Sequence, residues 1–370
     1  MLCCRLPLEY GRNGPPRPRT LYFRGPLTAI TRYKLRKLLK YGLVAALVAW
    51  LFTLFSGERM GVELLAWALL GIWTGILEEF FFGRRFRSLP VPVQFLGKFF
   101  LVSLLTITLI AGAFALKSDG FNLMTYEESY RVQDLLTMAQ FYKVVLRVLV
   151  VTSIALLVVQ LEEHLGRRVF LGFLLGRFDR PRAEERIVLS LDLVGSTAIA
   201  ERLGDLRYFR LLNYTYSLMT DAVLRNEAEI LKYVGDEVLF TWPMRVGSRG
   251  DHCLDLYFDI QSRIASHSDE LMREFGVVPQ YRGALHGGRV IVAQVGHIKR
   301  VIDHSGDVMN SVSRILGLAK AMKVDLLVSG ELLRRLPKAR ERFNIGPENL
   351  VPVKGRRREV RVHTIERLGP

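Results

Sequence analysis

The sequence ILKYVGDEVLFTW, residues 230–242, decides the fold expected for the C-terminal half of the chain. Two short runs rich in apolar and aromatic residues, Ile230–Val234 and Glu237–Trp242, flank the dipeptide Gly235-Asp236. A two-residue Gly-Asp connection between such runs is typical of a tight β-hairpin. The segment therefore predicts two antiparallel strands with a carboxylate at the turn between them.

Strand and helix patterns continue on both sides of this hairpin. A buried strand is predicted at Ile187–Leu193, and the segment Ser196–Glu229 is predicted to be largely helical. Downstream we expect a helix at Asp251–Phe275 and then two strands, at Gln280–His286 and Val290–Val295. A second helix is expected at Val308–Met322. The order β-α-β-β-α-β predicts a ferredoxin-like α/β sandwich with additions.

The N-terminal half is dominated by apolar residues, which make up 50% of the whole chain. Four long apolar stretches run at about Tyr41–Ser56, Met60–Phe82, Val91–Leu116 and Phe141–Leu161. The hydrocarbon core of a bilayer is about 30 Å thick and needs about 20 helical residues to cross. The sequence therefore predicts a domain of four transmembrane helices, with the lipid bilayer as its partner.

The net charge of +16 is distributed around these apolar stretches. The first forty residues are basic and contain one acidic residue, Glu9, and the loop Gly83–Ser88 is also basic, whereas Lys117–Leu136 carries four acidic residues. Because basic loops stay in the cytoplasm, both ends of the chain are predicted to be cytoplasmic. No zinc-finger spacing or RNA-binding signature accompanies the cations, so we expect no nucleic-acid partner.

The predicted spans contain few residues with charged side chains, and three of them are candidates for a role inside the membrane. They are Glu78 and Glu79, near the end of the second stretch, and Arg147 in the fourth. Such residues mark functional sites in some membrane proteins, but long side chains near helix ends also extend to the interface. We expect the second explanation for all three. Four spans with so few internal charges also argue against a transporter.

Two carboxylates stand out in the C-terminal half. Asp192 ends the first predicted strand and Asp236 lies at the tip of the hairpin. If these strands are neighbours, both side chains reach one spot beside the sheet. Mg²⁺ usually takes one or two carboxylates together with phosphate oxygens, and two metal ions suit phosphoryl chemistry. Aspartates are also common in turns, so this pair alone leaves the metal site open.

Three segments together carry a resemblance to a known family. LDLVGST at 191–197, KYVGDE at 232–237 and DHSGDVMNSVSR at 303–314 occur in the order found in class III adenylyl and guanylyl cyclases, and the chain resembles the membrane-bound bacterial type. The resemblance covers about Arg186–Glu366. It implies a multi-pass protein of a bacterial-type cytoplasmic (inner) membrane, with the catalytic domain in the cytoplasm.

The resemblance assigns roles to individual residues. Asp192 and Asp236 match the family's metal-binding aspartates, which implies two divalent cations, Mg²⁺ or Mn²⁺. Lys232 and Asp303 match the pair that reads the edge of adenine. A Lys donor meets a ring nitrogen and an Asp acceptor meets the exocyclic amine, whereas guanine reverses this order. The implied reaction converts ATP to 3′,5′-cyclic AMP and pyrophosphate.

The remaining roles concern the ribose and the phosphates. Asn310 matches the family's ribose-orienting residue and Arg314 matches the arginine that stabilises charge on the α-phosphate. They are four residues apart on a predicted helix and so share one face. Lys354, in Val353-Lys354-Gly355, resembles a late lysine that meets the terminal phosphates. The resemblance also implies a homodimer, in which one chain gives the aspartates and the other gives the Lys–Asp pair, Asn310 and Arg314.

Other functions stay open at this point. A guanylate cyclase belongs to the same family, and a nucleotide-binding regulatory module without turnover is a second alternative. The hairpin is loosely similar to that of diguanylate cyclases, although only one glycine precedes Asp236. The sequence departs from the family's pattern at Ser190, where an aromatic residue is usual, and at Met309. Both are predicted packing positions.

These observations divide the chain into four parts. Residues 1–31 are predicted to be a disordered basic tail, and residues 32–162 a four-helix transmembrane domain. Residues 163–185 are predicted to be a helical linker, and residues 186–370 a cyclase catalytic domain. The linker helix is expected either to pair with its twin in a dimer or to lie on the membrane surface.

Overall fold

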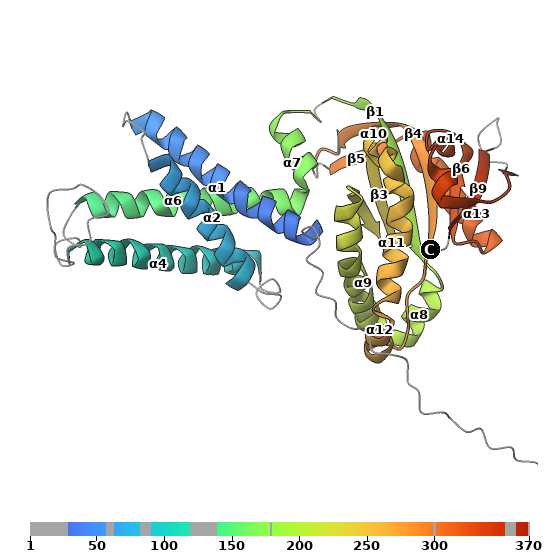
Figure 1. Ribbon diagram of the computed structural model, residues 1–370, viewed down its shortest axis with the longest axis horizontal. Coiled ribbons are helices and arrows are strands. Elements are labelled where there is room, and N and C mark those ends of the chain that lie inside the picture. The colour runs from blue at the N-terminus through green and yellow to red at the C-terminus, as the bar shows by residue number, and fades with distance from the viewer. Residues whose placement is uncertain are drawn as a thin grey trace, which may run out of the picture.

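The computed structural model describes residues 29–56, 63–81, 90–118, 139–177, 180–298, 301–351 and 360–368. An N-terminal bundle of helices is followed along the chain by an α/β domain built on one large sheet (Figure 1). Most of the N-terminal tail, the basic loop 83–88 and most of the acidic loop 117–136 lie outside the described residues.

Long helices occur at all four predicted apolar stretches. They are α1 (Ala29–Ser56), α2 (Glu63–Phe81), α4 (Val91–Ser118) and α6 (Ala139–Leu165). Among the described residues, two segments are long and apolar enough to cross a membrane, Ala29–Leu54 in α1 and Val145–Glu162 in α6. A shorter apolar stretch lies within α4. The four helices are therefore confirmed as helices, whereas four membrane spans are not confirmed.

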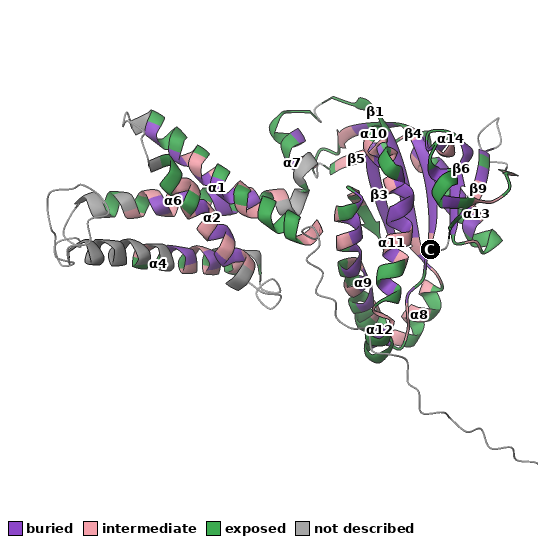
Figure 2. Ribbon diagram, viewed as in Figure 1, coloured by how far each residue is buried: buried purple, intermediate pink, exposed green. Residues whose placement is uncertain are grey.

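Large apolar side chains are exposed on the described parts of the bundle. Figure 2 shows exposed positions along its helices. Only 28% of an 18-residue apolar window within Ala29–Leu54, and 33% of the window Val145–Glu162, are buried inside the structure. Exposed examples come from each of the four helices and include Leu43, Leu65, Leu96, Phe100 and Leu146. A water-soluble protein rarely exposes so much contiguous apolar surface, so this pattern favours association with a membrane.

A cluster of charged residues connects three of these helices. The carboxylate of Glu78 on α2 accepts a hydrogen bond from the Lys98 ammonium on α4 at 2.8 Å, and Lys37 on α1 lies 3.7 Å from it. Glu78 and Lys98 are 5% and 6% exposed. The prediction that Glu78 extends to the interface is therefore wrong, because its charge is neutralised inside the bundle. Such pairing is what permits a charge at this depth.

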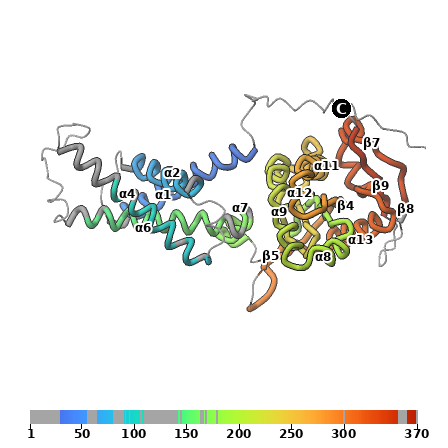
Figure 3. Tube along the Cα trace, turned by 90° about the horizontal axis from the view of Figure 1, so that it is seen from below, coloured from blue at the N-terminus to red at the C-terminus, as the bar shows by residue number. Residues whose placement is uncertain are grey.

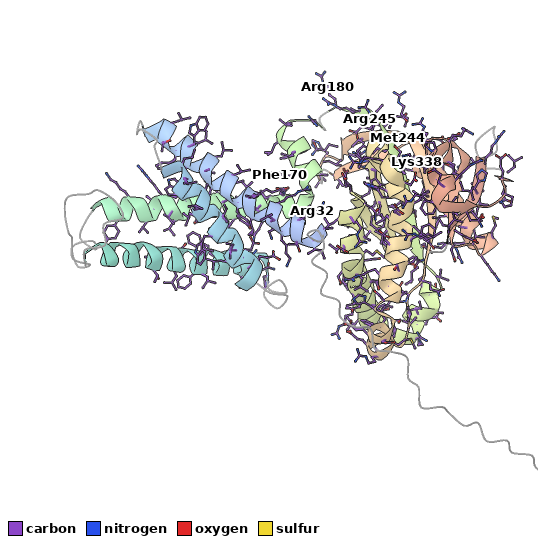
Figure 4. The ribbon with its side chains drawn as sticks, viewed as in Figure 1. Arg32, Phe170, Arg180, Met244, Arg245 and Lys338 are labelled. Carbon is purple, nitrogen blue, oxygen red and sulfur yellow. The ribbon has the colours of Figure 1, made fainter. Side chains whose placement is uncertain are left out.

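A short helix links the bundle to the sheet. Helix α7 (Arg167–Leu174) buries Phe170 and exposes Leu171 and Phe173. Figure 4 shows Phe170 on α7 and Arg32 near the start of α1, both at the end of the bundle nearer the sheet. The figure also shows Arg180, Arg245 and Lys338 projecting from the end of the domain at which the first strand begins.

The sheet has the topology predicted for its first part. The described strands are β1 (Arg182–Leu193), β2 (Glu229–Val234), β3 (Glu237–Pro243), β4 (Tyr281–Val295), β5 (Val301–Ser305), β6 (Leu326–Ser329), β7 (Phe343–Ile345), β8 (Asn349–Val351) and β9 (Val360–Arg367). Their order is β2-β3-β1-β4-β6-β9-β7, with β5 paired to β4 and β8 to β9. The antiparallel unit β2-β3-β1-β4 is the ferredoxin-like core. The parallel pairing of β4 with β6 makes the sheet mixed.

Helices cover both faces of this sheet. The described ones are α8 (Ser196–Leu203), α9 (Asp205–Arg225), α10 (Met244–Gly247), the 3₁₀ helix η1 (Arg249–Asp251), α11 (His252–Ala265), α12 (Ser268–Phe275), α13 (Asp307–Met322), α14 (Gly330–Leu333) and α15 (Ala339–Arg342). Successive residues of a strand point to opposite faces. Leu191 of β1 therefore packs with α9, α11 and α12, whereas Val188 packs with α13.

One predicted strand pair is wrong. The segments predicted as two strands, Gln280–His286 and Val290–Val295, form the single strand β4. Gly287 and Gly288 between them stay paired with β1. A β-carbon at either glycine would meet neighbouring side chains at 3.0 Å, so close packing, and not a turn, explains these residues. Figure 3 shows the β4–β5 hairpin projecting from the domain.

Candidate active site

The predicted hairpin turn is confirmed and is held from the side by helix α9. Val234 pairs with Glu237, and Gly235 adopts a φ of +62°, which glycine reaches without steric cost. The Tyr216 hydroxyl on α9 donates a hydrogen bond to the Gly235 carbonyl at 3.0 Å, and its ring lies 4.7 Å from that of Tyr233. These contacts fix the backbone next to Asp236.

Asp192 lies at the same end of the neighbouring strand. Leu191 pairs with Val238, so the register places Asp192 opposite Glu237 and beside Asp236. Burial raises the pKa of Tyr208, and the negative charges of Asp236 and Asp192 raise it further. The Tyr208 hydroxyl therefore lies close enough to both carboxylates to interact with them electrostatically. The structure brings the two predicted metal-binding residues together at the same end of neighbouring strands of the sheet.

A lysine that sequence reasoning missed contacts Asp192, one member of this pair. The Lys320 ammonium on α13 lies 2.8 Å from Oδ2 of Asp192. The side chain of Asp192 is 14% exposed and that of Lys320 is 46% exposed. Val188 and Asp192 point to the same face of β1, the face that α13 covers. Nothing in the family motifs distinguishes Lys320, so only the packing of α13 reveals it.

The donor set at this end of the strands fits a hard divalent cation. A cationic ammonium already lies in contact with Asp192, so the position favours positive charge. In the described part of the chain no group of three or more His, Cys, Asp or Glu residues surrounds a metal position. Two carboxylates are sufficient for Mg²⁺ when water and phosphate oxygens complete the coordination.

Lys232 and Asp303 form a second pair. Lys232 lies on β2 and Asp303 on β5, and the distance from Nζ to Oδ1 is 3.6 Å. Their side chains are 45% and 48% exposed. The two predicted base-reading residues thus lie side by side at the surface, although the strands that carry them do not pair.

Asn310 and Arg314 lie on the outer face of helix α13. The opposite face of this helix packs on the sheet through Val312 and Ile315. Both polar side chains are exposed, and neither makes a hydrogen bond or ion pair with another described residue. The fifth predicted substrate contact, Lys354, lies outside the described residues.

Two further polar residues border the site. The Ser190 hydroxyl donates a hydrogen bond to Glu237 at 2.5 Å, so this predicted packing position also bears a polar contact. His304, next to Asp303, is 9% exposed and neither ring nitrogen has a hydrogen-bond partner among the described residues. Burial and the nearby Arg186 lower the pKa of His304 to about 4. The sequence motifs do not indicate the hydrogen bond of Ser190.

The fold and the site correspond to one protein class. Residues 179–367, about half of the chain, match the family model described as "Adenylate and Guanylate cyclase catalytic domain". The chain therefore belongs to this family, as the three sequence motifs predicted.

Curated relatives share this domain. The chain is 41% identical to adenylate cyclase 2 of Rhizobium meliloti (strain 1021) over 179 residues, which cover 48% of this chain and 49% of that protein. It is 26% identical to an adenylate cyclase of Anabaena cylindrica over 186 residues, or 48% of this chain and 36% of that protein. The chain thus spans about half of the first relative and about a third of the second.

Solved structures of both activities are also similar. The guanylyl cyclase Cya2 has a TM-score of 0.44 at 17% identity, covering 52% of this chain and 95% of that one. The adenylyl cyclase CyaB from P. aeruginosa has a TM-score of 0.43 at 17% identity, covering 51% and 97%.

Proposed function

We propose that this chain is an adenylate cyclase that converts ATP to 3′,5′-cyclic AMP and pyrophosphate. The observation that carries the proposal is the 3.6 Å approach of Lys232 to Asp303. A donor and an acceptor side by side match the edge of adenine, where a ring nitrogen accepts and the exocyclic amine donates. Guanine presents the opposite order and would leave both side chains unpaired. The 41% identity to an adenylate cyclase supports the same substrate.

The remaining residues supply positioning and charge. Asp192 and Asp236 hold two divalent cations, Mg²⁺ or Mn²⁺. When bound, these ions lower the pKa of the ribose 3′-hydroxyl and neutralise the triphosphate. Asn310 orients the ribose for attack on the α-phosphorus. The Arg314 guanidinium offsets the charge that develops on the α-phosphate, and Lys354 is proposed to meet the terminal phosphates.

The position of Lys320 supports an active site shared between two copies of the chain. Lys320 contacts Asp192, whereas Asn310 lies ten residues earlier on the same helix. Ten helical residues span about 15 Å along the axis, and Arg314 points about 120° away from Lys320 around it. Asn310 and Arg314 of one chain are therefore badly placed to act at that chain's own aspartates. A two-fold homodimer resolves this, because each chain presents its outer α13 face to the aspartates of the other.

The bundle is proposed to anchor the enzyme in a cytoplasmic membrane as a multi-pass domain. Two segments meet the requirement for spanning, and the large apolar side chains exposed on all four helices favour a lipid environment. The buried pair of Glu78 and Lys98 is compatible with that environment, because its charges compensate each other. The basic flanks of the apolar stretches support a cytoplasmic position for the catalytic domain, where ATP is available.

The proposal is tested by identifying the product. The detergent-solubilised full chain is incubated with ATP or GTP and with Mg²⁺ or Mn²⁺, and nucleotides and pyrophosphate are separated chromatographically. Cyclic AMP and pyrophosphate in equal amounts are expected from ATP. The double variant Asp192→Asn/Asp236→Asn is the control for a contaminating enzyme. Cyclic GMP as the main product would assign a guanylate cyclase, and nucleotide binding without turnover would assign a regulatory module.

A further inference from the structure

We propose that Lys320 is an internal counterion that occupies the cation position at Asp192 and yields it only when a divalent metal ion binds. Lys320 thereby raises the concentration of metal that the enzyme needs. The inference rests on the proposed function, because it assigns Asp192 to the metal. Its basis is the 2.8 Å contact of the Lys320 ammonium with Oδ2 of Asp192, whose side chain is 14% exposed.

The fold holds the base of Lys320 in place and leaves its end free to move. The helix residues next to it, Leu316 and Ala319, are buried against the sheet, so the backbone of α13 is fixed there. The side chain itself is 46% exposed and has four rotatable methylenes. It can therefore swing into solvent without any movement of the helix. Within the described residues, Asp192 is its one ion-pair partner.

The ammonium and a metal ion compete for one carboxylate. A carboxylate removed from water needs a counter-charge, and Lys320 provides it in the absence of metal. Two cations in contact with the same oxygens repel each other, so a bound divalent ion displaces the ammonium. The competition is moderate, because a half-exposed ion pair is weak and a divalent ion attracts the carboxylate more strongly.

The experiment measures metal binding directly. Mn²⁺ is titrated into the full-length protein without nucleotide, and free Mn²⁺ is followed by electron paramagnetic resonance. The part of the Mn²⁺ binding that is lost in Asp192→Asn is assigned to the Asp192 site. Lys320→Gln is expected to lower the dissociation constant of that site about threefold to tenfold, the scale of one partly screened charge. Lys320→Arg, which keeps the cation, should behave as wild type, and Lys323→Gln, one turn further on, should have no effect.

Thermal unfolding gives a second measurement. In the absence of metal, Lys320→Gln should melt at a lower temperature than wild type, and Mn²⁺ should raise its melting temperature more. An unchanged Asp192-dependent constant in Lys320→Gln would overturn the inference and leave the proposed function standing. If the dissociation constant for Mn²⁺ is unchanged in Lys320→Gln but the KM for ATP is raised, Lys320 would be assigned to the triphosphate. That result would also overturn the inference and leave the proposed function standing. Absence of any Asp192-dependent binding would overturn the inference together with the proposed metal site.

Discussion

The Lys232 ammonium lies 3.6 Å from the Asp303 carboxylate, although β2 and β5 are not neighbours in the sheet. Both side chains are nearly half exposed. An ion pair of this exposure contributes little to stability, about 0–1 kcal/mol. The pair is therefore available to exchange its mutual contact for contacts with a nucleotide base.

Base selectivity should depend on this pair. Changing Lys232→Glu together with Asp303→Cys should reduce kcat/KM for ATP by as much as about 10⁴-fold, because buried polar groups of the base lose their partners. Some turnover of GTP is expected to emerge. Steady-state rates with both nucleotides check this, and Lys323→Glu is a matched charge-reversal control. ATP turnover close to wild type in the double variant would remove Lys232 and Asp303 from the site.

Subunit complementation should reveal a shared site. Asp192→Ala and Arg314→Ala should each be nearly inactive alone. When the two are co-expressed in equal amounts, half of the dimers are mixed and each keeps one intact site, so activity should return to about a quarter of wild type. Asp192→Ala mixed with Asp236→Ala is the control, because both defects lie in the same half of the site and no activity should return. Failure of the first pair to recover, with mixed dimers isolated by two affinity tags, would contradict the dimer model.

The turn that carries Asp236 should depend on Tyr216. Tyr216→Phe keeps the ring contact with Tyr233 and removes the hydrogen bond to Gly235. Such a bond contributes about 0.5–1.5 kcal/mol, so activity at limiting metal should fall roughly two- to tenfold. Saturating Mn²⁺ should restore most of it if the loss lies in the placement of Asp236. Tyr214→Phe, also on α9, controls for the loss of a hydroxyl, and equal losses in both variants would reject this explanation.

Stability should decrease in mild acid because of His304. Its pKa is lowered from 6.5 to about 4 in the folded chain, by burial and by Arg186, while Glu184, Asp303 and Lys232 also act on it. As the pH falls, His304 therefore binds a proton in the unfolded chain before it does so in the folded chain. The free energy of unfolding decreases between pH 6.5 and about pH 4. At pH 5 the loss is about 2 kcal/mol.

The measurement for His304 is chemical unfolding of the full chain at pH 7.5 and pH 5.0. His304→Leu should remove most of the difference between the two pH values, and it should not destabilise the protein at pH 7.5, since neither ring nitrogen makes a hydrogen bond among the described residues. His267→Gln, on the surface, should leave the difference unchanged. An equal acid loss in His304→Leu would show that another group is responsible.

Membrane topology should follow the distribution of charge. Single cysteines are placed at Ser118 and at Ser88 in a chain from which Cys3, Cys4 and Cys253 have been removed. An impermeant thiol reagent added to intact cells should label the first position and not the second. Labelling in the reverse pattern would invert the orientation, and labelling of neither would place both sites on the cytoplasmic side.

The sequence by itself determined the local structure and the identity of the chemical groups. The hairpin at Gly235-Asp236 depends on turn geometry, which two residues specify. The four apolar helices depend on the composition of continuous segments, and helix α13 on its apolar period. The prediction was wrong where one local pattern is compatible with two structures. Gly287 and Gly288 looked like a break between strands, and they are sites of close packing in β4.

Only the tertiary structure decided which side chains meet. Lys320 and Asp192 are 128 residues apart in the sequence, and their contact exists because α13 packs on the face of β1 to which Asp192 points. The buried pair of Glu78 and Lys98 depends in the same way on how α2 and α4 lie together. Such contacts arise from the packing of whole elements, and no short-range pattern encodes them, because each partner reads as an ordinary charged residue in its own segment.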